Sequence, residues 1–265
     1  MRSIDESWIA ARETEYGATI SFTAHDLNSD ARIARGGDRR CASASIIKLP
    51  ILVHLALAAA EGQIDWHERL SLAASDKVPG YGILRNLDAD LALSMRDLAT
   101  LMTALSDNTA SNMLIDRLGI DAINARTRAL GLATTTLHRK VYMPNTPAML
   151  PYGLGVTTTD EIVQLLMLIE RQHLGTPAAS ELVLTLLAAQ QDRAGIPRSL
   201  PDGWYYAGKT GSDSDLRNDC GIISGPVGEH YALAIFCQQL PHTPATVDHS
   251  GWRLIGAITA ALLGV

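Results

Sequence analysis

Residues 45–60 read SIIKLPILVHLALAAA and include the longest apolar run of the chain. After Lys48 nearly every position is apolar, and only Pro50 and His54 interrupt the run. A helix on a protein surface keeps a polar face, whereas a helix that is apolar all round is buried on every side. The run is too short to span a bilayer. We therefore predict a core helix over residues 46–60, with Ser45 and Lys48 at its N-terminal end.

The segments on either side of this helix show two kinds of pattern. From residue 44 to about residue 200 the chain is mostly helical in pattern. Ser94 is expected to cap a helix, and Thr158 and Glu161 are expected to form a capping box at the start of another. The patterns near the chain ends predict helices at 4–16 and 252–263 and strands at 18–25, 31–34, 204–210, 219–224 and 231–238.

These patterns predict an α/β fold of the α+β type. We expect an antiparallel sheet of about five strands, built from both chain ends and flanked by the terminal helices. The chain is expected to form a single catalytic domain over residues 1–265. Its α/β lobe comes from 1–40 and 201–265, and its all-helical lobe from 41–200. A binding site is expected in the cleft between the lobes.

Composition excludes several classes of partner. The chain has 265 residues, a formal net charge of −6 and no run rich in lysine or arginine. Nothing therefore indicates binding to nucleic acid or to an anionic membrane surface. No group of residues has the spacing of a metal or nucleotide site, so we expect no cofactor. The sequence favours a monomer that acts on a small molecule.

The N-terminus and the cysteines bear on the compartment. Residues 1–17 lack a basic segment followed by an apolar one, so the sequence as written contains no signal peptide. We expect a cytoplasmic protein, or a periplasmic or secreted one if a leader was removed. Cys41, Cys220 and Cys237 are an odd number without metal spacing. We expect buried free thiols; the alternative is that Cys220 and Cys237 pair across neighbouring strands.

Three short motifs contain the candidate catalytic residues. They are Ser45-Ile46-Ile47-Lys48, Ser106-Asp107-Asn108 and Lys209-Thr210-Gly211. Taken alone, the first would more often be a helix cap beside a surface lysine. The three motifs together occur in the order expected for one class of serine acyl-transfer enzyme. We therefore interpret them as one active site.

The chemistry supports Ser45 as nucleophile and Lys48 as its base. Residues i and i+3 share a helix face, so Lys48 Nζ can reach Ser45 Oγ. A serine hydroxyl becomes an effective nucleophile when a neighbouring base takes its proton. Lysine can accept that proton only if its pKa falls from about 10.4 toward 7. Burial beside the core helix and the nearby charge of Lys209 both lower the pKa.

The chain resembles the class A β-lactamases, within the superfamily of serine β-lactamases and penicillin-binding proteins, over nearly its whole length. The resemblance implies that Ser106 relays a proton to the leaving nitrogen and that Asn108 contacts the substrate amide. It implies that Lys209 and Thr210 hold the substrate carboxylate and support Ser106. The amides of Ser45 and Ser212 would form the oxyanion hole. Tyr81 corresponds to an aromatic residue in the wall of the family's binding pocket, although ordinary loop packing would explain it equally well. Asn145 corresponds to the family's Ω-loop asparagine and would bind substrate.

Other positions depart from the family's pattern. The glutamate that activates the deacylating water in class A enzymes corresponds to Val141, which cannot accept a proton. The expected partner of Arg139 in the loop, an aspartate, is Val156. The family's carboxylate-binding arginine is not matched on the strand after Gly211, where Arg217 is the nearest substitute. Acidic residues in 212–215 also add negative charge near the site.

The missing glutamate leaves three functions open. The first is a hydrolase of the class A type that is acylated by β-lactams or related amides and deacylates slowly. The second is a D-Ala-D-Ala peptidase, esterase or amidase of the same fold, with Lys48 as the second base; Tyr142 and His138 are weaker candidates for that base. The third is a sensor that binds or is acylated without turnover. The proton-relay residues Lys48 and Ser106 argue against a pure binding protein.

Overall fold

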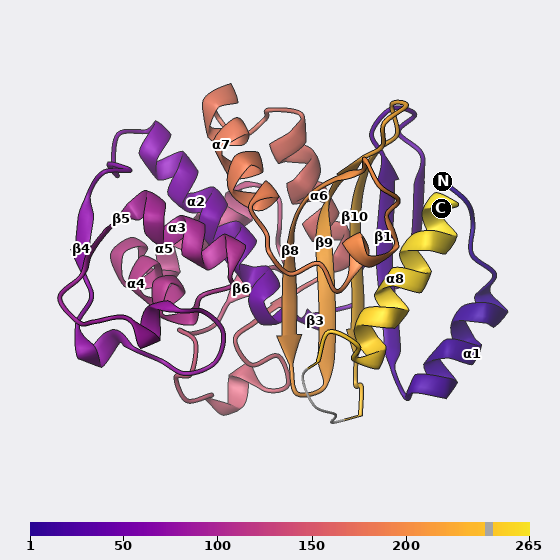
Figure 1. Ribbon diagram of the computed structural model, residues 1–265, viewed down its shortest axis with the longest axis horizontal. Helices are drawn as coiled ribbons and strands as arrows, with labels where there is room; N and C mark the ends of the chain where they lie inside the picture. The colour runs from indigo at the N-terminus through magenta and orange to yellow at the C-terminus, as the bar shows by residue number, and fades with distance from the viewer. Residues whose placement is uncertain (242–245) are drawn as a thin grey trace.

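The computed structural model describes residues 1–241 and 246–265. Its main sheet has the strand order β2-β1-β10-β9-β8, and every neighbouring pair is antiparallel. β1 pairs with β10 from Thr19 opposite Gln238 to Asp26 opposite Tyr231, which confirms a sheet built from both chain ends (Figure 1). The strands are β1 (Thr19–Asp26), β2 (Arg32–Arg35), β8 (Tyr205–Asp213), β9 (Leu216–Ser224) and β10 (His230–Gln238).

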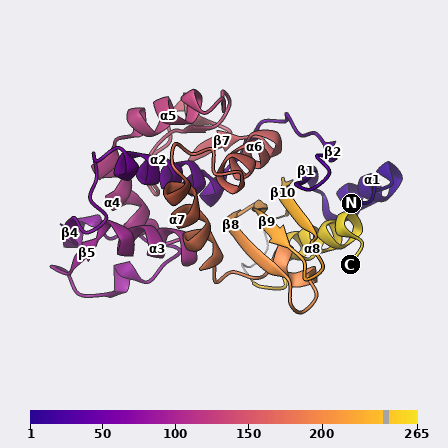
Figure 2. The same cartoon turned by 90° about the horizontal axis from the view of Figure 1, so that it is seen from above.

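Helices cover both faces of this sheet (Figures 1 and 2). On one face α1 (Glu6–Tyr16) and α8 (Ser250–Leu263) share a core cluster with β1 and β10. The other face packs against the helical lobe, and Phe236 and Ile222 belong to the same core cluster as the core helix. The helices of the lobe are α2 (Lys48–Ala60), α3 (Met95–Ala104), α4 (Asn108–Leu118), α5 (Ile120–Ala129), α6 (Thr159–Glu170) and α7 (Pro177–Ala188).

The predicted core helix is α2, and every residue from Lys48 to Ala58 is buried. The α-helix begins later than predicted because the preceding residues form a 3₁₀ turn, η1 (Ala44–Ile47). Ser45 therefore lies in this tighter turn rather than in the α-helix itself. The remaining 3₁₀ turns are η2 (Ala74–Asp76), η3 (Leu84–Asn86), η4 (Pro147–Met149) and η5 (Ile196–Ser199).

The helical lobe also contains short strands, which the prediction of a mostly helical block missed. They form a three-stranded sheet in the order β3-β7-β6 and a two-stranded sheet of β4 and β5. Each has only two or three residues, too few for an alternating pattern to be recognised. These strands are β3 (Cys41–Ala42), β4 (Arg69–Ser71), β5 (Ala92–Ser94), β6 (Thr136–Leu137) and β7 (Gly155–Thr157).

The two predicted helix caps differ in outcome. Ser94 caps α3, and Asp97 returns the bond in a complete capping box. Thr158 caps α6 by accepting from the Glu161 amide at 3.1 Å. The Glu161 carboxylate instead accepts from the amides of Thr134 and Thr135, so the box predicted there is only half formed. Glu161 thereby ties the segment before β6 to the start of α6.

All three cysteines are buried and free, as predicted. Cys220 lies opposite Ala234 on the face toward the helical lobe, whereas Cys237 lies in the core under α1 and α8. Because the two thiols are on opposite faces of the sheet, they do not pair. Within the described part of the chain, no helix is long and apolar enough to cross a membrane.

Candidate active site

The 3₁₀ turn brings Ser45 and Lys48 into register. The Lys48 amide donates to the carbonyl oxygen of Ser45, and side chains three residues apart are eclipsed in such a turn. Ser45 is partly exposed, whereas the Lys48 side chain is buried beneath it. The preceding residue, Ala44, has a φ of 43°, in the left-handed region. That backbone strain, about 1–3 kcal/mol, falls immediately before the candidate nucleophile.

Ser106 is also held in a left-handed conformation, with a φ of 54°. The next residue, Asp107, fixes the surrounding backbone: one oxygen caps α4 at Ala110, and the other accepts from the amides of Ile83 and Leu84. A Cβ at Gly82 would lie 2.2 Å from the Asp107 carboxyl carbon, so this close approach requires glycine. Asp107 thus acts as an anchor between the Tyr81 loop and Ser106.

The Ser106 hydroxyl lies between two buried lysines. Lys48 Nζ donates to Ser106 Oγ at 3.1 Å, to the Ser106 carbonyl at 2.6 Å and to Asn108 Oδ1 at 2.9 Å. Lys209 Nζ donates to the same Ser106 Oγ at 3.1 Å and to the Thr210 carbonyl at 2.7 Å. The three motifs therefore meet at one point, the Ser106 hydroxyl.

Both lysines have lowered pKa values. Burial, followed by the charge of Lys209, holds the pKa of Lys48 well below its ordinary value. Burial lowers the pKa of Lys209 to about 8. Neither ammonium forms an ion pair with a carboxylate within residues 1–241 and 246–265. A lysine in this environment can be neutral near pH 7 and can accept a proton.

The contact expected between Lys48 Nζ and Ser45 Oγ is not a hydrogen bond in this structure. Among the described residues, no hydrogen bond joins Lys48 Nζ to Ser45 Oγ, because all three bonds of the amine go to the Ser106-Asp107-Asn108 segment. The eclipsed placement keeps the two side chains on the same face of the turn. The Ser45 hydroxyl therefore remains available to the cleft.

β8 passes very close to the turn that contains Ser45. A Cβ at Gly211 would lie 3.0 Å from the Ser43 carbonyl oxygen and 3.1 Å from the Ile46 amide nitrogen. Glycine at this position lets the strand approach the turn. Ser212, the next residue, lines the same cavity as Ser45.

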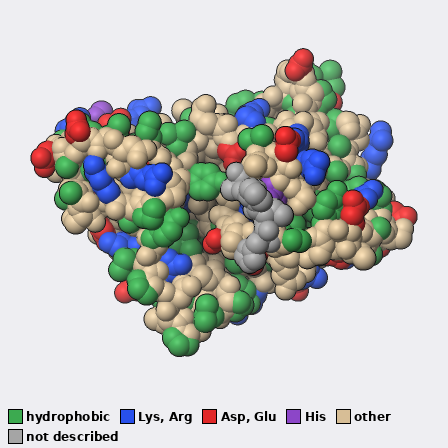
Figure 3. Space-filling model, turned by 60° about the horizontal axis from the view of Figure 1, so that its bottom comes forward, with side chains coloured by type: hydrophobic (Ala, Val, Ile, Leu, Met, Phe, Trp, Pro, Cys, Tyr) green, Lys and Arg blue, Asp and Glu red, His purple; other side chains and the backbone are tan. Residues whose placement is uncertain are grey.

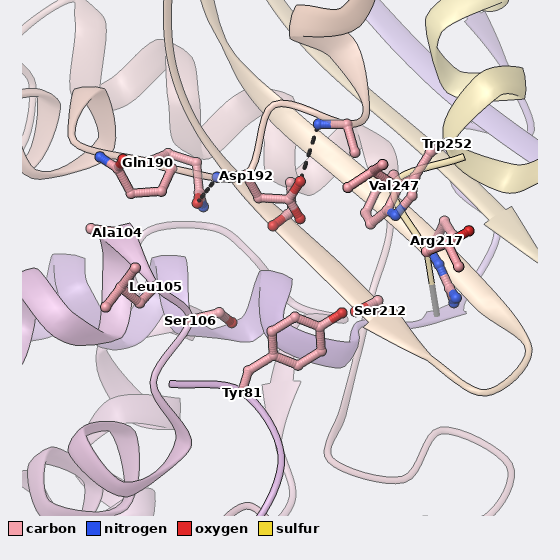
Figure 4. A pocket seen from close by; sticks show the side chains of 14 residues that line it. Tyr81, Ala104, Leu105, Ser106, Gln190, Asp192, Ser212, Arg217, Val247 and Trp252 are labelled. Atoms are coloured by element: carbon pink, nitrogen blue, oxygen red, sulfur yellow. Dashed lines mark hydrogen bonds between the residues drawn. The ribbon is translucent and has the colours of Figure 1, made fainter. Parts of the chain in front are cut away.

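Two cavities meet at this point, in the hollow between the lobes (Figure 3). The first, about 270 Å³, contains Ser45 and is lined also by Asn108, Val141, Tyr142 and Arg139. The second, about 300 Å³, begins at Ser106 and Thr210 (Figure 4). Three residues line both cavities: Tyr81, Ser212 and Arg217.

Val141 is fixed beside Ser45 by its backbone. Its amide donates to Asn112 Oδ1 at 2.8 Å, and its carbonyl accepts from Asn112 Nδ2 at 3.1 Å. The valine side chain lines the nucleophile's cavity and also a small space next to Lys48. An apolar group thus stands where the resemblance implies a carboxylate.

The remaining loop residues do not all reach the site. Asn145, expected to bind substrate, lines neither cavity and instead accepts from Arg139 Nε. The His138 ring lies 3.3 Å from the Gly153 carbonyl oxygen and is also outside both cavities. Tyr142 does line the first cavity, and its φ of 62° turns it over the loop at Gly80, where a Cβ would lie 2.5 Å from its hydroxyl.

Sequence reasoning missed Asp192. This carboxylate lines the second cavity on the segment between α7 and η5. No local pattern marks it, because it belongs to no motif and reaches the site only through the packing of the two lobes. Arg217, named only as a substitute, lines both cavities and is 2% exposed.

The fold and the site define a serine hydrolase of the penicillin-recognising class. The sequence profile of the beta-lactamase enzyme family matches residues 6–265, and the chain belongs to that family as a class A-like serine β-lactamase-type hydrolase. A beta-lactamase from Bacillus licheniformis is 27% identical over 231 residues, which cover 85% of this chain and 73% of that protein.

Solved structures give the same result. A beta-lactamase from Sphaerobacter thermophilus matches with a TM-score of 0.87 and 32% identity, over 98% of this chain and 97% of its own. PBP-A matches with a TM-score of 0.83 and 25% identity, over 98% of this chain and 97% of its own. A leucine-to-glutamate variant of PBP-A, solved as an acyl-enzyme complex with penicillin G, matches equally well.

Proposed function

We propose that this enzyme forms an acyl-enzyme on Ser45 with β-lactams or related amides and releases the acyl group slowly. One observation supports this proposal above the others: the groups needed for acylation are assembled around Ser106, while Val141 occupies the place of the second base. Membership of the family supports acylation of Ser45. Val141 is the reason to expect slower deacylation than in class A enzymes that have a glutamate at this position.

Acylation uses the lysine pair as follows. Ser45 Oγ attacks the carbonyl carbon as its proton passes to Lys48. In its neutral form the amine has two protons and a lone pair, so it gives up one of its three bonds to residues 106–108 and turns the lone pair to Ser45. The tetrahedral oxyanion is bound by the amides of Ser45 and Ser212. When the carbon–nitrogen bond breaks, the proton moves from Lys48 through the Ser106 hydroxyl to the leaving nitrogen. The products are the Ser45 ester and an amine, which stays attached to the acyl group when the substrate is a β-lactam and is released when the substrate is a linear amide.

Deacylation requires a water molecule to lose a proton as it attacks the ester. Val141 cannot take that proton, and the absence of a general base typically slows such a step by about 10²- to 10⁴-fold. Lys48, neutral again after acylation, is the base that remains beside the ester. With Lys48 as base, the Ser45 ester can still be hydrolysed and the enzyme regenerated, but at a reduced rate.

The same geometry favours a second function, a peptidase or esterase of this fold that deacylates with Lys48. Such an enzyme needs no carboxylate at position 141, which agrees with the valine there. The PBP-A variant was solved as an acyl-enzyme with penicillin G, which supports acylation by a penicillin in a protein of this fold. A non-turnover sensor is the remaining alternative.

Intact-mass spectrometry with time separates these functions. The protein is mixed with a penicillin and, separately, with a chromogenic cephalosporin, and both adduct and product are followed. We expect an adduct on Ser45 that outlasts many turnovers of an ordinary β-lactamase, and slow product release. Ser45→Ala should form no adduct. Rapid product release without an adduct would contradict slow deacylation, and activity in Ser45→Ala would remove the mechanism.

The lowered pKa values predict a bell-shaped pH profile for acylation. Toward acid pH the rate should fall, because Lys48 becomes protonated and cannot act as a base. Above about pH 8 the rate should fall again, because Lys209 loses the charge that holds an anionic substrate. The measurement is the second-order acylation rate with a penicillin across the pH range. Lys209→Arg should move the alkaline limb to higher pH, since arginine stays charged; an unmoved limb would contradict the assignment.

A further inference from the structure

The second cavity lies on the leaving-group side of the scissile bond. Ser45, which takes the acyl group, lines the first cavity, whereas Ser106, which is proposed to protonate the leaving nitrogen, lines the second. The second cavity, about 300 Å³, lies at the lower end of the range for pockets that bind small molecules. It therefore has room for a leaving group with a side chain of its own.

One wall of this cavity presents a buried cation. The Arg217 side chain donates through Nη1 to the carbonyls of Asp213 and Leu216, but its buried Nε has no hydrogen-bond partner among residues 1–241 and 246–265. Its guanidinium lies 5.8 Å from the ring centre of Trp252 and forms no ion pair with any described residue. A buried donor without an acceptor is unfavourable, so an anionic ligand that accepted from Nε would stabilise this wall.

A separate wall presents the Asp192 carboxylate, which forms no ion pair with any residue that the structure describes. Asp192 Oδ1 accepts from the Ala194 amide at 3.1 Å, and the Asp192 amide donates to Gln190 Oε1 at 3.0 Å. In Figure 4 the Asp192 carboxylate points into the cavity between Gln190 and Val247. The neighbouring Arg193 turns away and lies over the Tyr206 ring, at 5.5 Å, so it does not neutralise Asp192.

The segment that carries Asp192 is tied to both lobes. Gln190 Nε2 donates to the Thr103 carbonyl of α3 at 3.2 Å. Six residues further on, the Ile196 amide donates to the buried Asp219 carboxylate of β9 at 2.7 Å. A Cβ at Gly195 would lie 2.2 Å from that same carboxylate. Asp192 is thus held in place before any ligand arrives, which lowers the entropy cost of binding.

We propose that the second cavity selects a leaving group that is an amino acid with a basic side chain. Its α-carboxylate would bind Arg217 with Thr210, and its side-chain cation would bind Asp192. The apolar side chains of Leu105, Val247 and Trp252 would pack against the methylene groups between the two charges. This inference rests on the proposed function, because the leaving amine is the one released when Ser45 is acylated.

Matched acyl donors test the inference. They share one acyl group and differ only in the C-terminal residue, which is lysine, norleucine, alanine or glutamate, each in both enantiomers. We expect kcat/KM for the lysine donor to exceed that for the norleucine donor, which has nearly the same length, by about tenfold, because only the lysine ammonium can donate a charged hydrogen bond to Asp192. The glutamate donor should be the poorest.

Variants assign the preference to Asp192. Asp192→Asn keeps an oxygen for the Ala194 amide, and it should reduce the lysine-to-norleucine ratio to about one. The matched control is Asp202→Asn, an exposed carboxylate outside the cavity, which should keep the ratio. Equal rates for lysine and norleucine donors in the wild type, or an unchanged ratio in Asp192→Asn, would overturn the inference.

Measuring the penicillin adduct on the same protein preparations distinguishes a failure of this inference from a failure of the proposed function. If the penicillin acylates Ser45 but no donor with a basic C-terminal residue is preferred, the inference alone fails. If no acyl donor and no penicillin modifies Ser45, the proposed function fails with it.

Discussion

Val141→Glu is expected to accelerate hydrolysis of the Ser45 acyl-enzyme by about 10²- to 10⁴-fold, the usual contribution of a general base. The two hydrogen bonds to Asn112 use only backbone atoms of Val141, so they will hold a glutamate at the same place. Its carboxylate would enter the cavity beside Ser45, close to the amine of Lys48. The measurement is the first-order loss of a penicillin adduct, followed by intact mass.

The control for this prediction is Val141→Gln. Glutamine has nearly the same size as glutamate and is also polar, but it has no basic group. Only the glutamate variant should release the adduct quickly. If both variants release it equally fast, water access rather than proton transfer limits deacylation. If neither does, a group other than residue 141 controls the step.

Lys48→Met is expected to lower the acylation rate by about 10²- to 10⁴-fold, because it removes the base while filling the same buried space. Lys48→Arg should be nearly as inactive, since arginine keeps the charge but does not deprotonate in proteins. The measurement is the rate of adduct formation with a penicillin. Thermal unfolding of each variant verifies that the loss is not one of folding.

These two variants distinguish two roles of Lys48: a neutral base that takes the Ser45 proton, and a fixed positive charge. If Lys48→Arg acylates at the wild-type rate, the positive charge at this position suffices and the neutral amine is not the base. Acylation at the wild-type rate in Lys48→Met would show that Ser45 is activated by another group, and Ser106 with Lys209 would be the next candidate.

Much of the fold follows from local sequence patterns. The core helix is predictable because residues 49–60 are apolar on nearly all sides, and such a segment has few alternatives to burial. The main sheet is predictable because its C-terminal strands are long and separated by a clear turn at 225–228. The short strands of the helical lobe are not predictable, because two or three residues define no period.

The residues of the candidate site also fall into those that the sequence predicts and those that it does not. The meeting of Lys48 and Lys209 at Ser106 could be predicted because each of these residues belongs to one of the three motifs, whereas the catalytic roles of Ser45 and these residues stay predictions. Asp192 could not be predicted, since its position depends on how the segment after α7 bridges the lobes. Asn145 shows the limit of spacing alone: its spacing matched the family, but its side chain accepts from Arg139 Nε and lines neither cavity.

The pairing of β1 with β10 also constrains how the protein acquires its structure. Thr19 Oγ1 donates to Gln239 Oε1 at 2.6 Å, although the residues are 220 positions apart in the sequence. During synthesis the first hairpin must wait, with its inner edge unpaired, until almost the entire polypeptide has been made. Such distant contacts slow folding. The turn that contains Ser45 is synthesised early, but the wall supplied by β8 arrives only with the last quarter of the chain.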